Sequence, residues 1–174
     1  MWIDAGYDPP AGGKMSNKLD LFESAIESPL GPVKVAVNER GALVAVSFVD
    51  GEMGGENDLR CEPVLFQLQG YFRGERKEFE SELDPVGTEF EQKVWAEVRR
   101  IPHGATTTYG EIARRIGDPD ASRAVGVANA RNPIAILIPC HRVIGSDGDL
   151  TGYAGGLDRK KWLLDHESGQ ERLF

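Results

Sequence analysis

The sequence predicts an α/β protein, with a small antiparallel sheet and one helix in its first half and mostly helices in its second half. Over residues 22–49, apolar residues alternate with polar ones, as they do in half-buried strands. After residue 88 they recur at helical spacing, behind Thr or Ser residues that suit helix N-termini. Gly and Pro residues separate these segments, which is typical of turns.

The first half begins with residues 1–20, which are rich in Gly, Pro and polar residues and which we expect to form a flexible tail. Three short β-rich runs follow within residues 22–49, with turn-forming residues between them at 28–31 and 38–41. Strands joined by such short turns pair antiparallel. We therefore expect a three-stranded meander.

A helix and a short edge strand complete the predicted N-terminal domain, residues 21–85. Val64 and Leu68 have helical spacing, and Gly74 suits the end of that helix. The charged segment 75–87 then has the pattern of an edge strand followed by a linker.

The second half contains three short helices in succession. Thr88 and Glu91 form the pattern of a capping box, so a helix is predicted over 88–100. Thr108 and Glu111 repeat this pattern at the head of "YGEIARRIG", and "SRAVGVANA" follows after a turn. The last two helices resemble a helix–turn–helix. On its own that signal is weak, because many helical domains contain such pairs.

The net charge of −8 is confined to the first half. Residues 1–85 hold 8 Lys+Arg and 16 Asp+Glu, whereas residues 86–174, which we expect to form the second domain, hold 12 of each. An acidic chain is a poor candidate for binding nucleic acid through net charge alone. DNA binding must therefore be carried by local features.

Composition also limits the possible classes of function. The chain has 174 residues, 40% of them hydrophobic, which is enough for a real core. No apolar run reaches the length of a membrane span or a secretory signal, so we expect no membrane partner and a cytoplasmic location. Cys61 and Cys140 have no zinc-ligand spacing with the histidines, so we expect no metal, and Cys61 reads as a buried, inert thiol. Neither a dinucleotide fingerprint nor a P-loop is present, so we expect no cofactor.

The segment "ILIPCHRVIG", residues 136–145, carries the strongest chemical signal. A buried-looking strand ends at Pro139, and Cys140, His141 and Arg142 follow. A thiol becomes a useful nucleophile when a neighbouring base or cation lowers its pKa. Adjacent side chains of a strand point to opposite faces, so His141 would reach Cys140 only where the chain leaves the strand, or through a water. From adjacency alone, a structural cysteine beside a core histidine is the commoner interpretation.

The surrounding pattern favours chemistry. "RAVGVANARNPIAILIPCHRVIGSDGDLTGYAGGLDRKKWLLDHE", residues 123–167, resembles the O6-alkylguanine-DNA alkyltransferases, also called methylated-DNA–protein-cysteine methyltransferases. Its Pro-Cys-His-Arg-Val core is highly specific to them. The resemblance extends through "TTTYGEIA" and "FEQKVWAEVRRIPHG", and loosely into "LQGYFRGER". It implies a ribonuclease H-like N-terminal domain, then a mostly helical domain with a helix–turn–helix and an active-site loop.

The resemblance further implies a monomeric repair protein that reacts once. Cys140 would take the alkyl group irreversibly from O6 of guanine in double-stranded DNA. A water between Cys140 and His141, with Glu167 behind the histidine, would relay the thiol proton; taken alone, Glu167 reads as a solvated acid at a helix end. Tyr109 would donate a proton toward N3 of the departing guanine, since guanine leaves better as a neutral base. Asn132 would tie the backbone beyond Cys140, although it also suits a helix C-cap.

By the same resemblance, the guanine pocket would be lined by Tyr153, Ala154, Gly155, Ala135 and Val143. Ala135 stands where some relatives have a proline, and Ala154 where some have a serine. These departures leave open which alkyl groups fit, and they favour weak reaction with the free base O6-benzylguanine.

DNA contacts are implied for the third predicted helix of the second half. The damaged base must be flipped out of the duplex, and Arg123 would fill the space that it leaves. Arg123 is expected to meet the minor groove together with four small residues: Ala121, Ser122, Ala124 and Gly126. In isolation, such a face is more often a packing interface. Phosphate contacts are expected for a further set, Arg114, Arg115, Arg131 and Arg142.

Three other functions fit parts of the sequence. A damage sensor that binds alkylguanine without reacting would lack Cys140, which is present. A transcription regulator would use the helix–turn–helix but leaves "PCHRV" unexplained. A Cys–His hydrolase would need an oxyanion-hole motif, and none is visible.

Overall fold

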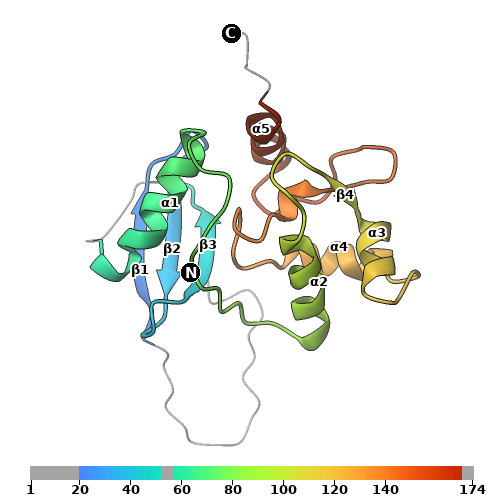
Figure 1. Cartoon of the computed structure of the whole chain (residues 1–174), viewed down its shortest axis with the longest axis horizontal. Coiled ribbons are helices and arrows are strands. Elements are labelled where there is room, and N and C mark those ends of the chain that lie inside the picture. The colour runs from blue at the N-terminus through green and yellow to red at the C-terminus, as the bar shows by residue number, and fades with distance from the viewer. Residues whose placement is uncertain (1–19, 52–56, 170–174) are drawn as a thin grey trace, which may run out of the picture.

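The computed structural model describes residues 20–51 and 57–169, and its elements form two groups (Figure 1). One group, from the first half of the chain, is a sheet with a helix on it. The other, from the second half, consists mostly of helices. The α/β fold class is thus confirmed. The predicted tail, residues 1–20, lies outside the described residues apart from Asp20.

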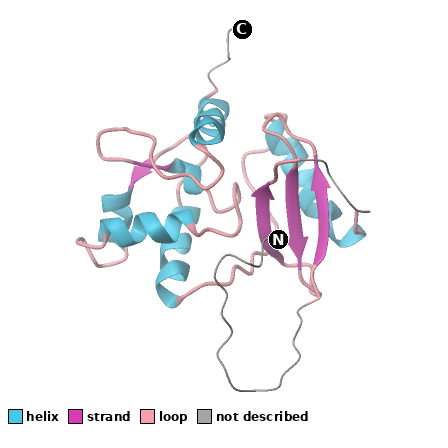
Figure 2. Cartoon of the chain, turned by 180° about the vertical axis from the view of Figure 1, so that it is seen from behind, coloured by secondary structure: helices cyan, strands magenta, loops and turns pink. Residues whose placement is uncertain are grey.

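The three predicted strands are present and lie side by side in Figure 2. They are β1 (Phe22–Ile26), β2 (Val33–Val37) and β3 (Leu43–Phe48), paired antiparallel in that order. Short turns join them, and Gly31 and Gly41 in these turns have positive φ, where other residues would be strained. Buried valines of β2 supply much of the core beneath helix α1.

Helix α1 (Glu62–Phe72) packs on this sheet, behind a single 3₁₀ turn, η1 (Leu59–Cys61). Val64 and Leu68 face the core, as their spacing predicts. Cys61 is fully buried, as expected, and burial raises the pKa of its thiol.

The edge strand predicted within residues 75–87 is wrong. Only Leu83 pairs with β3, through a single parallel bridge to Leu43. The N–H of Glu80 instead donates to the side-chain carbonyl of Gln67 in α1, at 2.7 Å. A side chain thus satisfies the backbone where a strand ladder would have done so.

The predicted helices of the second half are α2 (Glu89–Arg99), α3 (Tyr109–Arg115) and α4 (Ser122–Ala130). The capping box of α2 is complete, because Thr88 and Glu91 each accept a hydrogen bond from the other's N–H. At α3 only Thr108 caps the helix, since the carboxylate of Glu111 pairs with Arg114 and Arg115. Helices α3 and α4 pack together and against α2, in the predicted helix–turn–helix arrangement.

Two further features frame the site. Strands β4 (Thr107–Thr108) and β5 (Val143–Ile144) pair parallel and join the start of α3 to the segment after Cys140. Helix α5 (Leu157–Ser168) then packs against the turn that holds Cys140. No helix among the described residues is long and apolar enough to cross a membrane.

The strand predicted in "ILIPC" is also wrong. Residues 134–139 form successive turns, in which the N–H of Ile138 donates to the carbonyl of Ile134 at 3.0 Å. Ile134 pairs with Val46 of β3, but only through an isolated bridge. Ile136 has a φ of 72°, a strained value for a β-branched residue. A short apolar run indicates burial, which is correct here, but it does not fix an extended backbone.

Candidate active site

Cys140 begins a 3₁₀ turn, η2 (Cys140–Arg142), instead of ending a strand. Burial raises the pKa of its thiol, while a hydrogen bond from Asn132 and the charge of Lys160 act to lower it. The net direction is upward, so the thiol is mostly protonated at neutral pH. A base is needed to make it a nucleophile.

His141 follows in the turn and is fully buried. Its Nε2 lies 2.8 Å from Oε1 of Glu167, and its Nδ1 has no hydrogen-bond partner among the described residues. A carboxylate only accepts hydrogen bonds, so we assign the proton to Nε2 and a lone pair to Nδ1. Burial lowers the pKa of His141 against the opposing effect of Glu167, which keeps the ring neutral and able to take up a proton at Nδ1.

Glu167 of α5 is the centre of the buried network. Its Oε1 accepts hydrogen bonds from Tyr71, His141 and Arg142, each at 2.8 Å, and its Oε2 accepts from Nε of Arg142 at 2.7 Å. Burial by itself would raise the pKa of Glu167, but the hydrogen bonds and charges of His141 and Arg142 outweigh it and hold the pKa well below its usual range. Glu167 is therefore an ionised carboxylate behind the histidine, not a solvated acid.

Gly104 fits closely against the same carboxylate. Its N–H donates to Oε2 of Glu167 at 3.5 Å, and its φ is +80°. A Cβ at this position would lie 3.1 Å from the backbone carbonyl oxygen of Glu167. Both the left-handed backbone and the close approach therefore favour glycine here.

Arg142 is not available to a DNA phosphate, contrary to the sequence prediction. It is buried, and besides Glu167 it binds the carbonyl oxygen of Ile101 at 2.6 Å. The buried carboxylate draws this arginine inward, because an unpaired buried charge is costly. The other three predicted phosphate ligands are exposed but engaged with carboxylates: Arg114 and Arg115 with Glu111, and Arg131 with Glu91.

Two asparagines hold the backbone around Cys140. Nδ2 of Asn132 donates to the carbonyl of Ile138 at 2.7 Å, so it holds the backbone before Cys140. The contact predicted for Asn132 beyond Cys140 is therefore wrong. The bond to the carbonyl of Cys140 itself comes from Asn129 of α4, at 3.2 Å. The two amides together fix the turn that carries the thiol.

Tyr109 lies at the start of α3, and its hydroxyl donates to the carbonyl of Thr151 at 2.9 Å. Burial raises the pKa of Tyr109, so the hydroxyl keeps its proton. The fully buried Lys160 donates to the same carbonyl at 2.9 Å and to that of Val143 at 2.6 Å. Tyr109 and Lys160 thus both hold the loop that leads from Cys140 to α5.

A cavity of about 60 Å³ borders Cys140. Four of the predicted pocket residues line it: Ala135, Tyr153, Ala154 and Gly155. The fifth, Val143, lies buried in β5 and does not, whereas Phe48 at the end of β3 does. The loop between β5 and α5 contributes three of these lining residues, Tyr153, Ala154 and Gly155.

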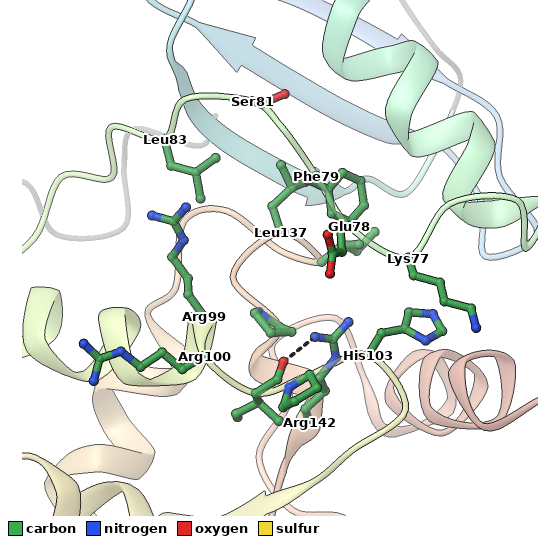
Figure 3. Close-up of a pocket in the computed structure, with 14 residues that line it drawn as sticks. Lys77, Glu78, Phe79, Ser81, Leu83, Arg99, Arg100, His103, Leu137 and Arg142 are labelled. Atoms are coloured by element: carbon green, nitrogen blue, oxygen red, sulfur yellow. Dashed lines mark hydrogen bonds between the residues drawn. The ribbon is translucent and has the colours of Figure 1, made fainter.

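A larger cavity, of about 410 Å³, touches the same segment from residues 136, 137 and 139 (Figure 3). His103 and Arg142 lie close together at one side of it, and Arg99 and Lys77 lie apart around its rim. Size alone would favour this cavity as a ligand site. However, Cys140 does not line it, so we place the chemistry at the smaller cavity.

Helix α4 presents the predicted DNA-binding residues unevenly. Arg123 and Ala124 are exposed. The other three are partly buried: Ala121, Ser122 and Gly126. No carboxylate among the described residues forms an ion pair with Arg123. Gly126 faces Tyr109, since a Cβ there would lie 3.8 Å from its ring. The exposed residue one turn beyond Arg123 is Val127, which the sequence pattern did not indicate.

Four residues that complete the site were not predicted: Phe48, Tyr71, Asn129 and Lys160. For two of them a signal was present, because a polar residue stands on the apolar face of a helix. Asn129 follows the buried Val125 by one turn, and Lys160 precedes the buried Leu163 by one turn. Phe48 and Tyr71 look like ordinary core residues in the sequence.

Known proteins are similar to this chain in sequence and in fold. Residues 21–85 match the family model "6-O-methylguanine DNA methyltransferase, ribonuclease-like domain", and residues 89–169 match "6-O-methylguanine DNA methyltransferase, DNA binding domain". A methylated-DNA–protein-cysteine methyltransferase of Methanosarcina acetivorans is 50% identical over 154 residues, or 84% of this chain and 98% of that protein. A protein of the same name from Mycolicibacterium paratuberculosis is 61% identical over 144 residues, or 80% of this chain and 87% of that protein.

Solved structures agree. The O6-methylguanine methyltransferase of Mycobacterium tuberculosis has a TM-score of 0.79 at 42% identity, covering 89% of this chain and 97% of that chain. The Mycobacterium tuberculosis protein OGT in complex with DNA has a TM-score of 0.77 at 45% identity, covering 84% of this chain and 92% of that chain. The two family models together match well over half of the sequence. The chain therefore belongs to the 6-O-methylguanine DNA methyltransferase family.

Proposed function

We propose that this protein repairs O6-alkylguanine in double-stranded DNA by moving the alkyl group to Cys140, irreversibly and once per molecule. Family membership supports the coarser part, repair of O6-methylguanine by a DNA methyltransferase. One observation carries the finer part. The buried thiol of Cys140 adjoins a neutral histidine, His141, whose Nε2 is held by Glu167 and whose Nδ1 has no protein partner among the described residues.

The reaction is a displacement at the alkyl carbon. Nδ1 of His141 takes the thiol proton of Cys140 through a bridging water, and the thiolate attacks the carbon. The S–C bond forms while the C–O6 bond breaks, and the electron pair of that bond moves into the guanine ring. Tyr109 donates a proton to N3, so guanine leaves as a neutral base. The proton on His141 replaces that of Tyr109 through solvent, which balances the step without a co-reactant.

The thioether product explains why each molecule reacts once. An S-alkylcysteine carries no ionisable proton, and its C–S bond is stable in water. The protein is thus both acceptor and catalyst, and its amount sets the number of lesions repaired.

The flipped base enters the cavity beside Cys140 after the loop of residues 145–156 opens. The hydroxyl oxygen of Tyr153 is buried without a partner among the described residues, which leaves it free to bind the base. At Gly155 a Cβ would lie 2.7 Å from the ring of Tyr153 and 3.2 Å from that of Phe48. Glycine there keeps these rings in place and lets the backbone approach the base.

Helix α4 enters the minor groove, and Arg123 takes the place of the flipped base. The exposure of Arg123 and its lack of an ion-pair partner among the described residues support this role, because its guanidinium is free for DNA. The second half of the chain has no net charge. Binding should therefore rest on a few phosphate contacts and depend only modestly on salt.

We also infer a monomer that acts in the cytoplasm. The proposed reaction takes all its groups from one chain. Cys61 and Cys140 are both free thiols, and a reducing compartment keeps them so.

The stoichiometry can be tested with a duplex that carries one tritium-labelled O6-methylguanine. We expect label on the protein to rise to one methyl group per molecule and to stop there when DNA is in excess. Continued release of a labelled small molecule would show turnover and would refute the single-use mechanism.

A further inference from the structure

The hydroxyl of Tyr71 reaches from the first half of the chain into the active site. Tyr71 belongs to α1 and is fully buried. Its hydroxyl donates to Oε1 of Glu167 at 2.8 Å, between positions 96 residues apart in the chain. Burial and the nearby Glu167 raise the pKa of Tyr71 well above its usual value, so the hydroxyl keeps its proton and remains a donor.

We propose that Tyr71 is a positioning residue for the transfer: its hydroxyl fixes Glu167 so that His141 faces Cys140. The N-terminal half of the chain thereby sets the reactivity of the thiol. The inference rests on the proposed function and assigns a role to the half that contributes neither the nucleophile nor the helix–turn–helix. It gives Tyr71 no contact with DNA or with the alkyl group.

Three donors share one oxygen of Glu167, since Nη2 of Arg142 also lies 2.8 Å from Oε1. The hydroxyl of Tyr71 and Nε2 of His141 each lie 2.8 Å from Oε1. The bond from Tyr71 stabilises negative charge on this oxygen, and so weakens the attraction of Glu167 for the proton on His141. Without the hydroxyl, His141 would be more basic, and the carboxylate would be less firmly oriented.

The ring of Tyr71 has a separate, structural role. It packs edge-on against Phe72 and His166, with ring centroids 5.5 and 5.3 Å away, and tilted against Phe79 at 5.6 Å. The variant Tyr71→Phe keeps this packing and removes only the hydroxyl. The matched control is Phe79→Leu, which disturbs the same ring cluster and leaves the bond to Glu167 intact.

Several titratable groups surround this network, and each of them can contribute to the pH dependence of the transfer rate. From every element packed there, they are Tyr71, His103, Cys140, Arg142, Tyr153, Lys160 and His166. Burial lowers the pKa of His103, which also titrates on the acid side. Any shift must therefore be assigned to His141 by a residue-specific signal.

The kinetic test measures single-turnover transfer from a duplex with O6-methylguanine over about pH 5.5 to 9, together with denaturant unfolding. We expect Tyr71→Phe to react about 10-fold more slowly at neutral pH, the scale that corresponds to loss of one hydrogen bond to a charged group. Its rate should also fall off at a higher pH than that of the wild type, because His141 is protonated more readily. Phe79→Leu should lose stability but keep the wild-type profile. A Tyr71→Phe profile that superimposes on the wild type, or is only scaled down at all pH values, would overturn the proposal.

A second readout separates this proposal from the proposed function. Nitrogen NMR of histidine-labelled protein without DNA follows the tautomer and the titration of His141. If the wild type takes up no methyl group, the proposed function fails, yet a titration moved to higher pH in Tyr71→Phe would still support the link to His141. An unchanged titration overturns the Tyr71 proposal even when the wild type transfers normally.

Discussion

The hydroxyl of Tyr109 donates to the carbonyl oxygen of Thr151 at 2.9 Å, so the proposed proton donor is bound to the loop that carries the cavity residues Tyr153, Ala154 and Gly155. Lys160 holds the same carbonyl at 2.9 Å. In the proposed reaction, a shift of this loop would admit the base, and Lys160 would keep the carbonyl paired while the hydroxyl of Tyr109 turned to N3 of guanine. We propose that opening of the loop would also release the hydroxyl of Tyr109 for proton donation.

Replacing Tyr109 with phenylalanine should slow transfer by about 10²-fold, the lower end of the range for loss of a general acid. Guanine would then have to leave as an anion or take its proton from solvent. Binding to undamaged duplex should change little. The single-turnover rate and the binding constant are the two measurements, and equal losses in both would assign Tyr109 to DNA binding instead.

Arg123→Ala should weaken transfer to duplex DNA while leaving the reactivity of Cys140 intact. The side chain is exposed and lacks an ion-pair partner among the described residues, so its loss should not affect folding. Comparing O6-methylguanine in a duplex with the same base in a single strand isolates the flipping step. We expect at least a 10-fold larger defect on the duplex, since a single strand needs no base to be replaced in a stack. Arg114→Ala, which removes an arginine already paired with Glu111, is the control.

Glu167→Gln should destabilise the fold by about 3–5 kcal/mol at neutral pH, because Arg142 would remain buried without its counter-charge. The pKa of Glu167 is held down in the folded state, so its stabilising effect is present above the unfolded value of about 4.3 and is lost as the pH falls toward the folded value. The gap in unfolding free energy between wild type and variant should thus narrow below about pH 4. Denaturant titrations from pH 7 to 3 measure it, and a gap that stays constant would refute the electrostatic account.

Free O6-benzylguanine should label Cys140 slowly. Ala135 lines the cavity with a methyl group where a proline ring would offer a flat face to the benzyl group. Rapid labelling by this compound would contradict the prediction. The obvious gain-of-function variant, Ala135→Pro, carries a penalty visible in the structure: the N–H of Ala135 donates to the carbonyl of Val46 at 3.0 Å, and proline would abolish that bond.

Local patterns predicted the local structure well. The capping box of Thr88 and Glu91 gave the start of α2, and the alternation of residues 22–49 gave the meander. The apolar run before Cys140 led to a wrong prediction of a strand, because buried apolar residues occur both in strands and in compact turns.

Contacts made by the folded chain were beyond such patterns. A hydrogen bond such as that from Tyr71 to Glu167 has no periodicity to show it. The burial of Arg142 likewise depends on where α5 brings Glu167. Nothing in the chain around Phe48 indicates that the end of β3 reaches the cavity of Cys140.

The central claim is that Cys140 is the acceptor, and the mass of its peptide tests this most directly. The protein is incubated with a duplex that carries one O6-methylguanine, without any added cofactor, then digested and weighed, with Cys140→Ser as the control. We predict a gain of one methylene on the peptide that contains Cys140, in one-to-one yield, and none in the variant. An unmodified Cys140 peptide, or a methyl group on Cys61 instead, would contradict the account.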